Sequence, residues 1–196
     1  MRNMHFLVIS VVLVFVGCVP SLHELYTEET LTFDPSIAGR WEQKDDEAVW
    51  EFTANADSKS YALTIFEKEK KKSELKAHLV NLNGKRFFDF YLGDNVEIET
   101  GDWVKLTLIP GHLFLRIDQT EPNLVFAAMN LDTINKLLEK KPELIKHEQI
   151  HDGDSIVLTD KPKQLQAFVT AGLEIEDFFG DPMILERAQP SDPNKP

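Results

Sequence analysis

The sequence is poor in cysteine and in positive charge, and it lacks an apolar run long enough to cross a membrane. Cys18 is the only cysteine among 196 residues, so no disulfide can form within the chain. The longest apolar stretch, residues 6–16 with Ser10 inside it, is shorter than the ~20 residues that a membrane-spanning helix needs. Because 21 Lys and Arg face 33 Asp and Glu, the composition argues against nucleic acid as a partner.

The common catalytic and cofactor motifs are also missing. The chain contains no G-x-S-x-G elbow, no P-loop and no dinucleotide fingerprint, and no repeat of domain-building length. These observations give no indication of an enzyme or of a cofactor. The length is that of one domain with a proper core.

The N-terminus has the pattern of a signal peptide. Arg2 supplies the positive charge, residues 6–16 form the apolar region, and the small residue Gly17 precedes Cys18. We therefore expect a signal peptide over residues 1–17, cleaved between Gly17 and Cys18. The alternatives are an ordinary secretory signal followed by a chance cysteine, and a transmembrane anchor.

The residues Phe15-Val16-Gly17-Cys18 resemble the lipobox of bacterial lipoprotein precursors, although Phe15 stands where that motif usually has Leu. The resemblance implies a diacylglycerol on the Cys18 thiol, an acyl chain such as palmitate on its amine, and a location in the cell envelope. Val19 after the cysteine, rather than Asp, favours the outer membrane if the organism has one. The partner implied is thus a membrane, reached through the anchor.

The composition divides the chain into four segments. The signal peptide spans 1–17, the lipidated Cys18 and a tether span 18–38, a single β-rich domain spans 39–188, and a proline-rich tail over 189–196 is expected to be disordered. Cleavage removes Arg2 and changes the net charge from −12 to −13. Such an acidic surface also disfavours lying flat on anionic headgroups.

Short segments with alternating apolar residues fill the region from 39 to 129. In 85–92, Phe88 and Phe90 alternate with Phe87 and Asp89, and Asn83-Gly84 before them is typical of a two-residue hairpin turn. Counting a segment over 103–109, about eight strands follow one another in hairpin order. Such a meander tends to curl or close, because closure removes exposed edges.

Helical spacing appears after residue 130. We expect one helix over 131–141 with Asp132 as its N-cap, a short helix starting at Pro142, and another over 160–172, capped by Asp160 and stopped by Gly172. Strands are expected over 155–159 and 181–188. The predicted fold class is α+β, mainly antiparallel β, as a curled meander or a lipocalin-like, partly closed barrel with two to three C-terminal helices.

Two family resemblances bear on this fold. Gly39-Arg40-Trp41 resembles the G-x-W motif on the first strand of lipocalins, where the Trp packs across the closed end of the barrel. The segments at 112–118 and 155–169 resemble a group of uncharacterised bacterial secreted or lipid-anchored proteins. The first resemblance implies a ligand-binding barrel, and the second implies no activity. A Phe-rich strand could line such a cavity or simply fill a core.

One metal motif is present. His147, Glu148 and His151 match H-E-x-x-H, in which a helix brings both imidazoles to a zinc ion and the Glu acts as general base. The segment is short, follows Pro142 and meets Gly153, so we expect an exposed pair that binds no metal. His78 and His112 are single strand residues, expected on the surface or in packing.

The sequence thus favours a lipid-anchored envelope protein without enzyme activity. It would bind a small apolar ligand or an envelope protein partner. A structural or assembly lipoprotein without a cavity is the first alternative, and a zinc hydrolase using the His147–His151 motif is the second.

Overall fold

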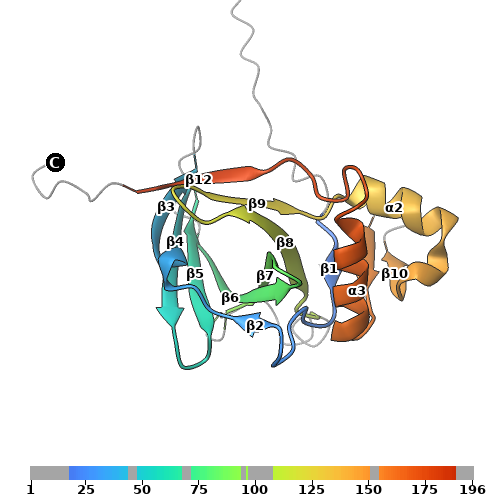
Figure 1. The fold of residues 1–196 in the computed structure, drawn as a ribbon, viewed down its shortest axis with the longest axis horizontal. Helices are drawn as coiled ribbons and strands as arrows, with labels where there is room; N and C mark the ends of the chain where they lie inside the picture. The colour runs from blue at the N-terminus through green and yellow to red at the C-terminus, as the bar shows by residue number, and fades with distance from the viewer. Residues whose placement is uncertain are drawn as a thin grey trace, which may run out of the picture.

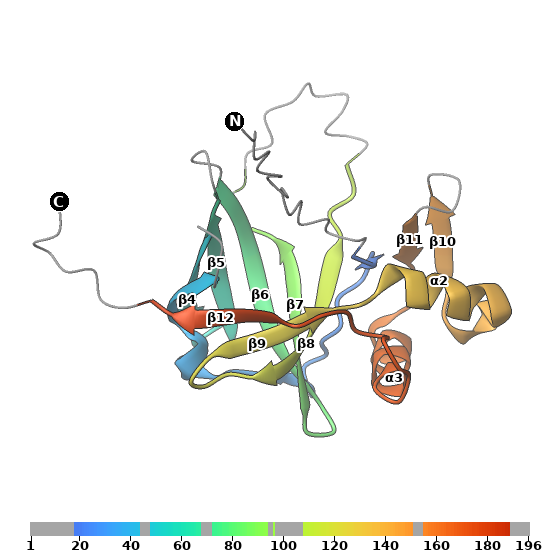
Figure 2. The ribbon, with the colours of Figure 1, turned by 90° about the horizontal axis from the view of Figure 1, so that it is seen from above.

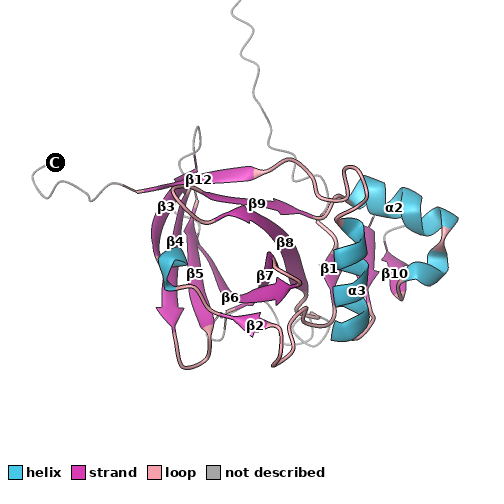
Figure 3. Cartoon of the chain, in the orientation of Figure 1, coloured by secondary structure: helices cyan, strands magenta, loops and turns pink. Residues whose placement is uncertain are grey.

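The chain folds into an antiparallel β-barrel with an α/β lobe packed against one side (Figures 1 and 3). The structure is a computed structural model, and it describes residues 18–43, 48–67, 72–93, 96, 108–150 and 155–188. The barrel prediction is confirmed. Two α-helices are present in these described residues, so the third helix that the sequence allowed is not found there.

Eight strands form the barrel wall, in the order β3-β4-β5-β6-β7-β8-β9-β12 with β12 returning to β3. All neighbouring pairs in this wall are antiparallel, and β8–β9 pairing completes the ring. The bounds of these strands are β3 Gly39–Gln43, β4 Val49–Asn55, β5 Ser60–Phe66, β6 Lys72–Leu82, β7 Lys85–Leu92, β8 His112–Gln119, β9 Leu124–Ala128 and β12 Met183–Arg187.

The alternation seen in the sequence sets which side chains enter the barrel. Phe88 and Phe90 of β7 lie in the barrel core, whereas Phe87 belongs to a second core on the outside. The turn before β7 is the expected one, because Asn83 and Gly84 both have positive φ, 53° and 84°. The Phe-rich strand therefore has apolar packing on both of its faces.

Most of the strand expected over 103–109 lies outside the described residues. β7 pairs directly with β8 over Arg86–Phe90 and Leu113–Ile117, which leaves no place between them. Residues 101–107 lie outside the described residues, and Leu108 and Ile109 are not in a strand. The eighth wall strand is β12 instead, a distant segment that the local pattern could not assign to the barrel.

The segment after Cys18 is not the tether that its composition predicted. It contains the short strands β1 (Pro20–Ser21) and β2 (Leu31–Thr32) and the 3-10 helix η1 (Pro35–Ile37). Val19, Leu25 and Ile37 are at most 1% exposed. Because the contacts that bury these residues come from distant strands and helices, irregular local spacing gave no sign of them.

The lobe is inserted between β9 and β12. It comprises α2 (Leu131–Lys140), the 3-10 helix η3 (Pro142–Leu144), β10 (His147–Ile150), β11 (Ser155–Leu158) and α3 (Pro162–Gly172). The strands β10, β11 and β1 extend the sheet from the first residues of β8, while the later residues of β8 pair with β9. β8 thus belongs to both the barrel and the lobe.

The helix ends differ in detail from the expectations. Asn130, not Asp132, caps α2, and its side chain accepts a hydrogen bond from Thr133 N–H at 3.2 Å. α3 begins after Lys161 without a side-chain cap, so Asp160 is not its cap. Gly172 is the last residue of α3, and a Cβ there would overlap the ring of Phe178. This glycine is needed for close packing rather than for a left-handed stop.

Two apolar cores result, one inside the barrel and one between the barrel and the lobe. The outer core includes Phe87 and Phe114 from the wall and Leu165, Phe168 and Val169 from α3. No helix in the described part of the chain is long and apolar enough to span a bilayer.

Candidate functional site

The inside of the barrel is lined by aromatic and aliphatic side chains from all eight wall strands. Phe52 and Phe88 stack with ring centroids 5.7 Å apart, and Phe88 and Phe90 are 5.2 Å apart. Trp50 contacts Phe126 at 5.6 Å. These rings are at most 8% exposed. They pack the middle of the barrel, so any site for a ligand must lie towards one of its two ends.

Trp41 lies at the end where η1 crosses the barrel. Its indole N–H donates to the carbonyl of Ile37 at 2.9 Å, and the ring is fully buried. The guanidinium of Arg187, the last residue of β12, lies over the ring at 4.1 Å. Gly39 is required here, because its φ is 125° and an added Cβ would lie 2.7 Å from the Arg187 guanidinium. We call this end the closed end.

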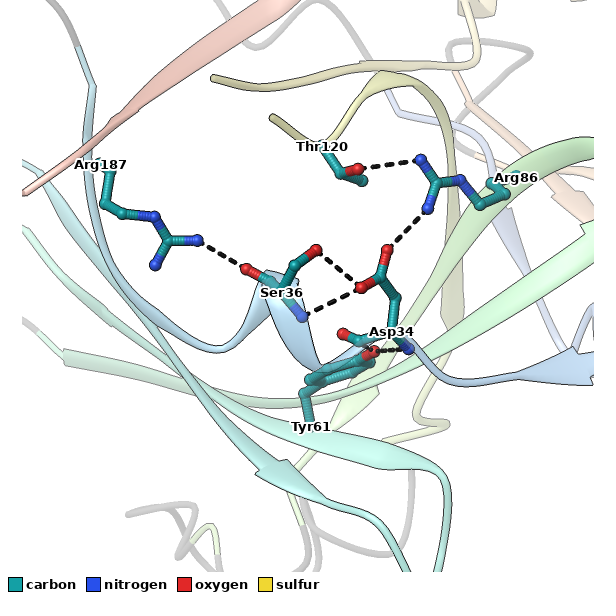
Figure 4. A network of polar contacts seen from close by, with 6 residues as sticks. All are labelled: Asp34, Ser36, Tyr61, Arg86, Thr120 and Arg187. Atoms are coloured by element: carbon teal, nitrogen blue, oxygen red, sulfur yellow. Dashed lines mark hydrogen bonds and ion pairs between the residues drawn. The ribbon is translucent and has the colours of Figure 1, made fainter. Parts of the chain in front are cut away.

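A polar network locks the closed end (Figure 4). The Arg86 guanidinium pairs with the Asp34 carboxylate at 2.8 Å and donates to the Thr120 hydroxyl at 2.9 Å. The Tyr61 hydroxyl donates to the Asp34 carbonyl and accepts from the Asp34 N–H, both at 2.8 Å. Arg187 donates to the carbonyls of Ser36 and Ala38, at 2.6 and 3.1 Å. These hydrogen bonds join the segment around η1 to β5, β7 and β12, and they therefore hold η1 in place.

The pKa values of Asp34 and Tyr61 reflect burial and hydrogen bonding at the closed end. Burial would raise the pKa of Asp34, but hydrogen bonds from Ser36 and the Arg86 guanidinium outweigh it and hold that pKa below its usual value. Burial raises the pKa of Tyr61 to about 12. The phenol therefore stays protonated and keeps donating over any ordinary pH range.

The opposite end of the barrel is lined by apolar side chains, and we call it the mouth. β5 ends there, and β6, β8 and β12 begin there. Its inward-facing residues are apolar yet only partly buried, and they pack against the barrel core: Ile65, Leu75, Leu113, Leu115 and Met183. In Figure 2 the mouth faces upward, and the β6–β7 hairpin points the other way. An apolar ring that still reaches solvent could accept an apolar ligand.

Trp50 lies directly below this ring. It pairs across the strands with Ile65 on β5 and with Trp41 on β3. Its indole nitrogen is buried and has no hydrogen-bond partner among the described residues. An unpaired buried N–H costs about 1–3 kcal/mol. The mouth therefore combines apolar walls with one donor that a ligand could satisfy.

Comparisons with protein-family models, with curated proteins and with solved structures found no match. The assignment of a function therefore depends on the geometry of this chain alone.

The sequence-predicted site residues fall in several places. Cys18 is half-buried at the start of the described chain, and Gly17 lies outside it. His147 and Glu148 are on β10, where adjacent side chains point to opposite faces, and His147 Nδ1 lies 2.9 Å from the Ile145 carbonyl. His151 is outside the described residues. Residues 147–150 thus form a strand rather than the helix on which the zinc hypothesis depends, and the described side chains include no metal-binding cluster.

Sequence reasoning missed a buried acid–imidazole pair on the outer wall of the barrel. Asp89 is fully buried, and its carboxylate lies 2.7 Å from His112 Nδ1. The second carboxylate oxygen accepts from the Leu25 N–H at 2.7 Å. Burial raises the pKa of Asp89, despite the opposing effect of His112. The sequence pattern identified Asp89 only as an alternating residue of its strand and His112 as a surface or packing residue, and the segment that covers them was expected to be a tether.

This pair is not part of a nucleophilic triad. Ser21 lies opposite His112 where β1 pairs with β8, but its hydroxyl donates to the His23 carbonyl at 2.8 Å. The Asp89 carboxylate instead fixes the segment after Cys18 to the barrel wall.

Two hollows of about 470 and 570 Å³ lie near hairpins. In the smaller, Arg86 is paired with Asp34 and Arg116 with Asp118. Because its guanidinium groups already have carboxylate partners, this hollow is a weaker candidate than the mouth.

Proposed function

We propose that this chain is a lipid-anchored cell-envelope protein that binds a small apolar ligand in the mouth of its barrel. The observation that carries this proposal is the unpaired Trp50 N–H beneath the partly exposed ring of Ile65, Leu75, Leu113, Leu115 and Met183. Apolar walls favour a hydrocarbon, and a buried donor favours one acceptor group on it. A fatty acid or another lipid with a terminal carboxylate or carbonyl has this chemistry.

The barrel is of the lipocalin-like kind in this proposal. Support comes from the order of the strands in the wall and from Trp41 of the G-x-W segment, which is buried at the closed end. The anchor is the diacylglycerol expected on Cys18, and the outer membrane is the favoured location if the organism has one. No catalytic step is part of this function.

Binding can be tested with the mature chain in solution, using Cys18→Ser to avoid thiol chemistry and the fluorescent fatty acid cis-parinaric acid as the probe. We expect one probe per chain by fluorescence titration and native mass spectrometry. Ile65→Glu places a charge beside Trp50 in the apolar ring and should weaken binding at least tenfold, about 1.4 kcal/mol or more. Ile184→Glu, on the exposed face of β12, should bind like the parent.

Equal binding by both variants would exclude the mouth as the site. Absence of any binding would favour the alternative, a structural or assembly lipoprotein. The packed rings of Phe52, Phe88 and Phe90 are what favour that alternative, because they leave the middle of the barrel filled.

The anchor is tested separately in cells. Cys18→Ser removes the sulfur that would carry the diacylglycerol, so the cleaved chain should move from the membrane pellet to the soluble fraction. Fractionation checks the location, and mass spectrometry checks that residues 1–17 have been removed. A cleaved Cys18→Ser chain that stays with the membrane would contradict the anchor.

A further inference from the structure

The anchoring residue has no spacer between it and the folded domain. Val19 is 1% exposed, and Pro20 and Ser21 pair with Leu113 and His112. The chain therefore joins the sheet two residues after Cys18. It joins at the first residues of β8, which is where β8 leaves the mouth.

The apolar rim of the mouth lies close to that point. Gly111 is in contact range of Pro20, since a Cβ on Gly111 would lie 3.4 Å from the Pro20 side chain. Just before it, Leu108 and Ile109 are 45% and 74% exposed. Phe66, where β5 ends at the same mouth, is 40% exposed. Large apolar side chains thus face solvent at the end of the barrel that carries the anchor.

The segment after the anchor is also fixed from two sides. The Leu25 N–H donates to Asp89 on the barrel wall at 2.7 Å, and the Leu25 carbonyl accepts from Gln166 of α3 at 2.8 Å. Leu25 itself is fully buried. These bonds, together with the pairing of Pro20 and Ser21 with β8, hold the segment after Cys18 against the barrel wall.

We propose that the anchor holds the mouth of the barrel against the surface of the lipid bilayer, with Leu108, Ile109 and Phe66 in the interfacial region. This inference rests on the proposed function, since it takes Cys18 as the anchor. The partner is the membrane itself. An acyl chain would then pass between the bilayer and the mouth without crossing bulk water. Contact at one apolar end also avoids laying the acidic sides of the protein on headgroups.

The orientation can be measured without relying on natural lipidation. Cys18 is the only thiol, so the mature chain can be coupled at that position to a maleimide lipid in phosphatidylcholine vesicles. Ile109→Trp places a reporter at the mouth, and Ile184→Trp places one on the side wall, 44% exposed. Each is compared with the parent chain in vesicles with and without brominated phosphatidylcholine, which quenches indoles at membrane depth.

We expect the additional emission from Ile109→Trp to shift to shorter wavelength and to be quenched roughly twofold, because interfacial side chains enter the bilayer by ~5–10 Å. The emission from Ile184→Trp should not change. No quenching of either reporter, or equal quenching of both, would overturn the proposed orientation.

The two proposals fail separately in this design. A chain that binds cis-parinaric acid in solution but shows no quenching at Ile109→Trp keeps its binding function and loses its orientation. A chain that shows quenching only at Ile109→Trp but binds no probe keeps the orientation and loses the ligand site. The artificial coupling makes both results independent of whether cells acylate Cys18.

Discussion

Trp41 and Trp50 are neighbours across the β3–β4 pair, but the hydrogen bonding of their indole N–H groups differs. Trp41 belongs to the closed end of the barrel, and Trp50 lies below the mouth. The indole N–H of Trp41 donates to Ile37, and Arg187 lies over its ring. The indole N–H of Trp50 is buried without a partner. A chain selected only for stability would satisfy both donors. The proposed ligand site at the mouth would explain this difference, because binding sites are where proteins depart from local rules of stability.

The largest expected effect separates these two residues. Trp41→Phe should destabilise the chain by about 2–4 kcal/mol, because it reduces core volume and leaves the Ile37 carbonyl without its donor. Trp50→Phe removes the same atoms but also removes an unpaired N–H, so its cost should be smaller by about 1 kcal/mol or more. Urea unfolding of both variants checks this, and equal losses would remove the contrast between the two ends.

The same two substitutions should have the opposite order of effect on ligand binding. Trp50→Phe should weaken cis-parinaric acid binding by about tenfold, the amount expected for one hydrogen bond to a charged acceptor. Trp41→Phe, measured below its unfolding transition, should leave the affinity unchanged.

Arg187 should come next in size. Arg187→Ala removes two hydrogen bonds to η1 and the cation over Trp41, and we expect a loss of about 1–3 kcal/mol in thermal or urea unfolding. Arg187→Lys keeps the charge but cannot reach two carbonyls with a planar fork, so it should restore only part of the loss. Full restoration by Lys would show that charge alone matters at the closed end.

The smallest expected effect is a change in the free energy of unfolding with pH. It contrasts Asp34, at the closed end, with Asp89, which holds the N-terminal segment. The folded state raises the pKa of Asp89, so its stabilising contribution is complete below the unfolded pKa and is lost as pH rises through the folded value. Asp34 has a lowered pKa, so its contribution is lost as pH falls through the folded value.

Asn variants separate the two contributions. Relative to the parent, Asp89→Asn should gain stability as pH rises through the folded pKa of Asp89, because the variant has no carboxyl group to lose its proton there. Asp34→Asn should lose less stability than the parent on acidification. Unfolding curves at matched ionic strength test both signs, and parallel pH profiles for parent and Asp89→Asn would refute the first.

The sequence predicted those features that depend on neighbouring residues. Alternation predicted that Phe88 and Phe90 share one face of their strand and that Phe87 lies on the other, which the two cores confirm, and Asn83-Gly84 predicted the turn that its φ values confirm. It missed features that join distant segments. Arg187 reaches Trp41 only after the barrel closes, and Leu25 is buried only because Asp89 and Gln166 are there to hold its peptide groups.

The candidate site was foreseen only as a choice between a lined cavity and a filled core. The filled core is present in the middle of the barrel, where the rings of Phe52 and Phe88 stack, whereas Ile65 and Leu75 remain partly exposed. Depth within a barrel depends on strand stagger, which no local pattern contains. The unpaired state of Trp50 depends on the same stagger.

The place of β12 at the end of the chain has a consequence for how the protein matures. Until residues 183–187 arrive, the wall is an open seven-stranded sheet whose edge strands, β3 and β9, have unpaired backbone groups. Closure pairs residues 41–43 with residues 185–187, contacts that are among the longest in sequence, and such contacts form slowly. Before closure, the free edges of this sheet can pair with other chains. A chaperone that shields these two edges would therefore serve this protein most during the interval before β12 closes the ring.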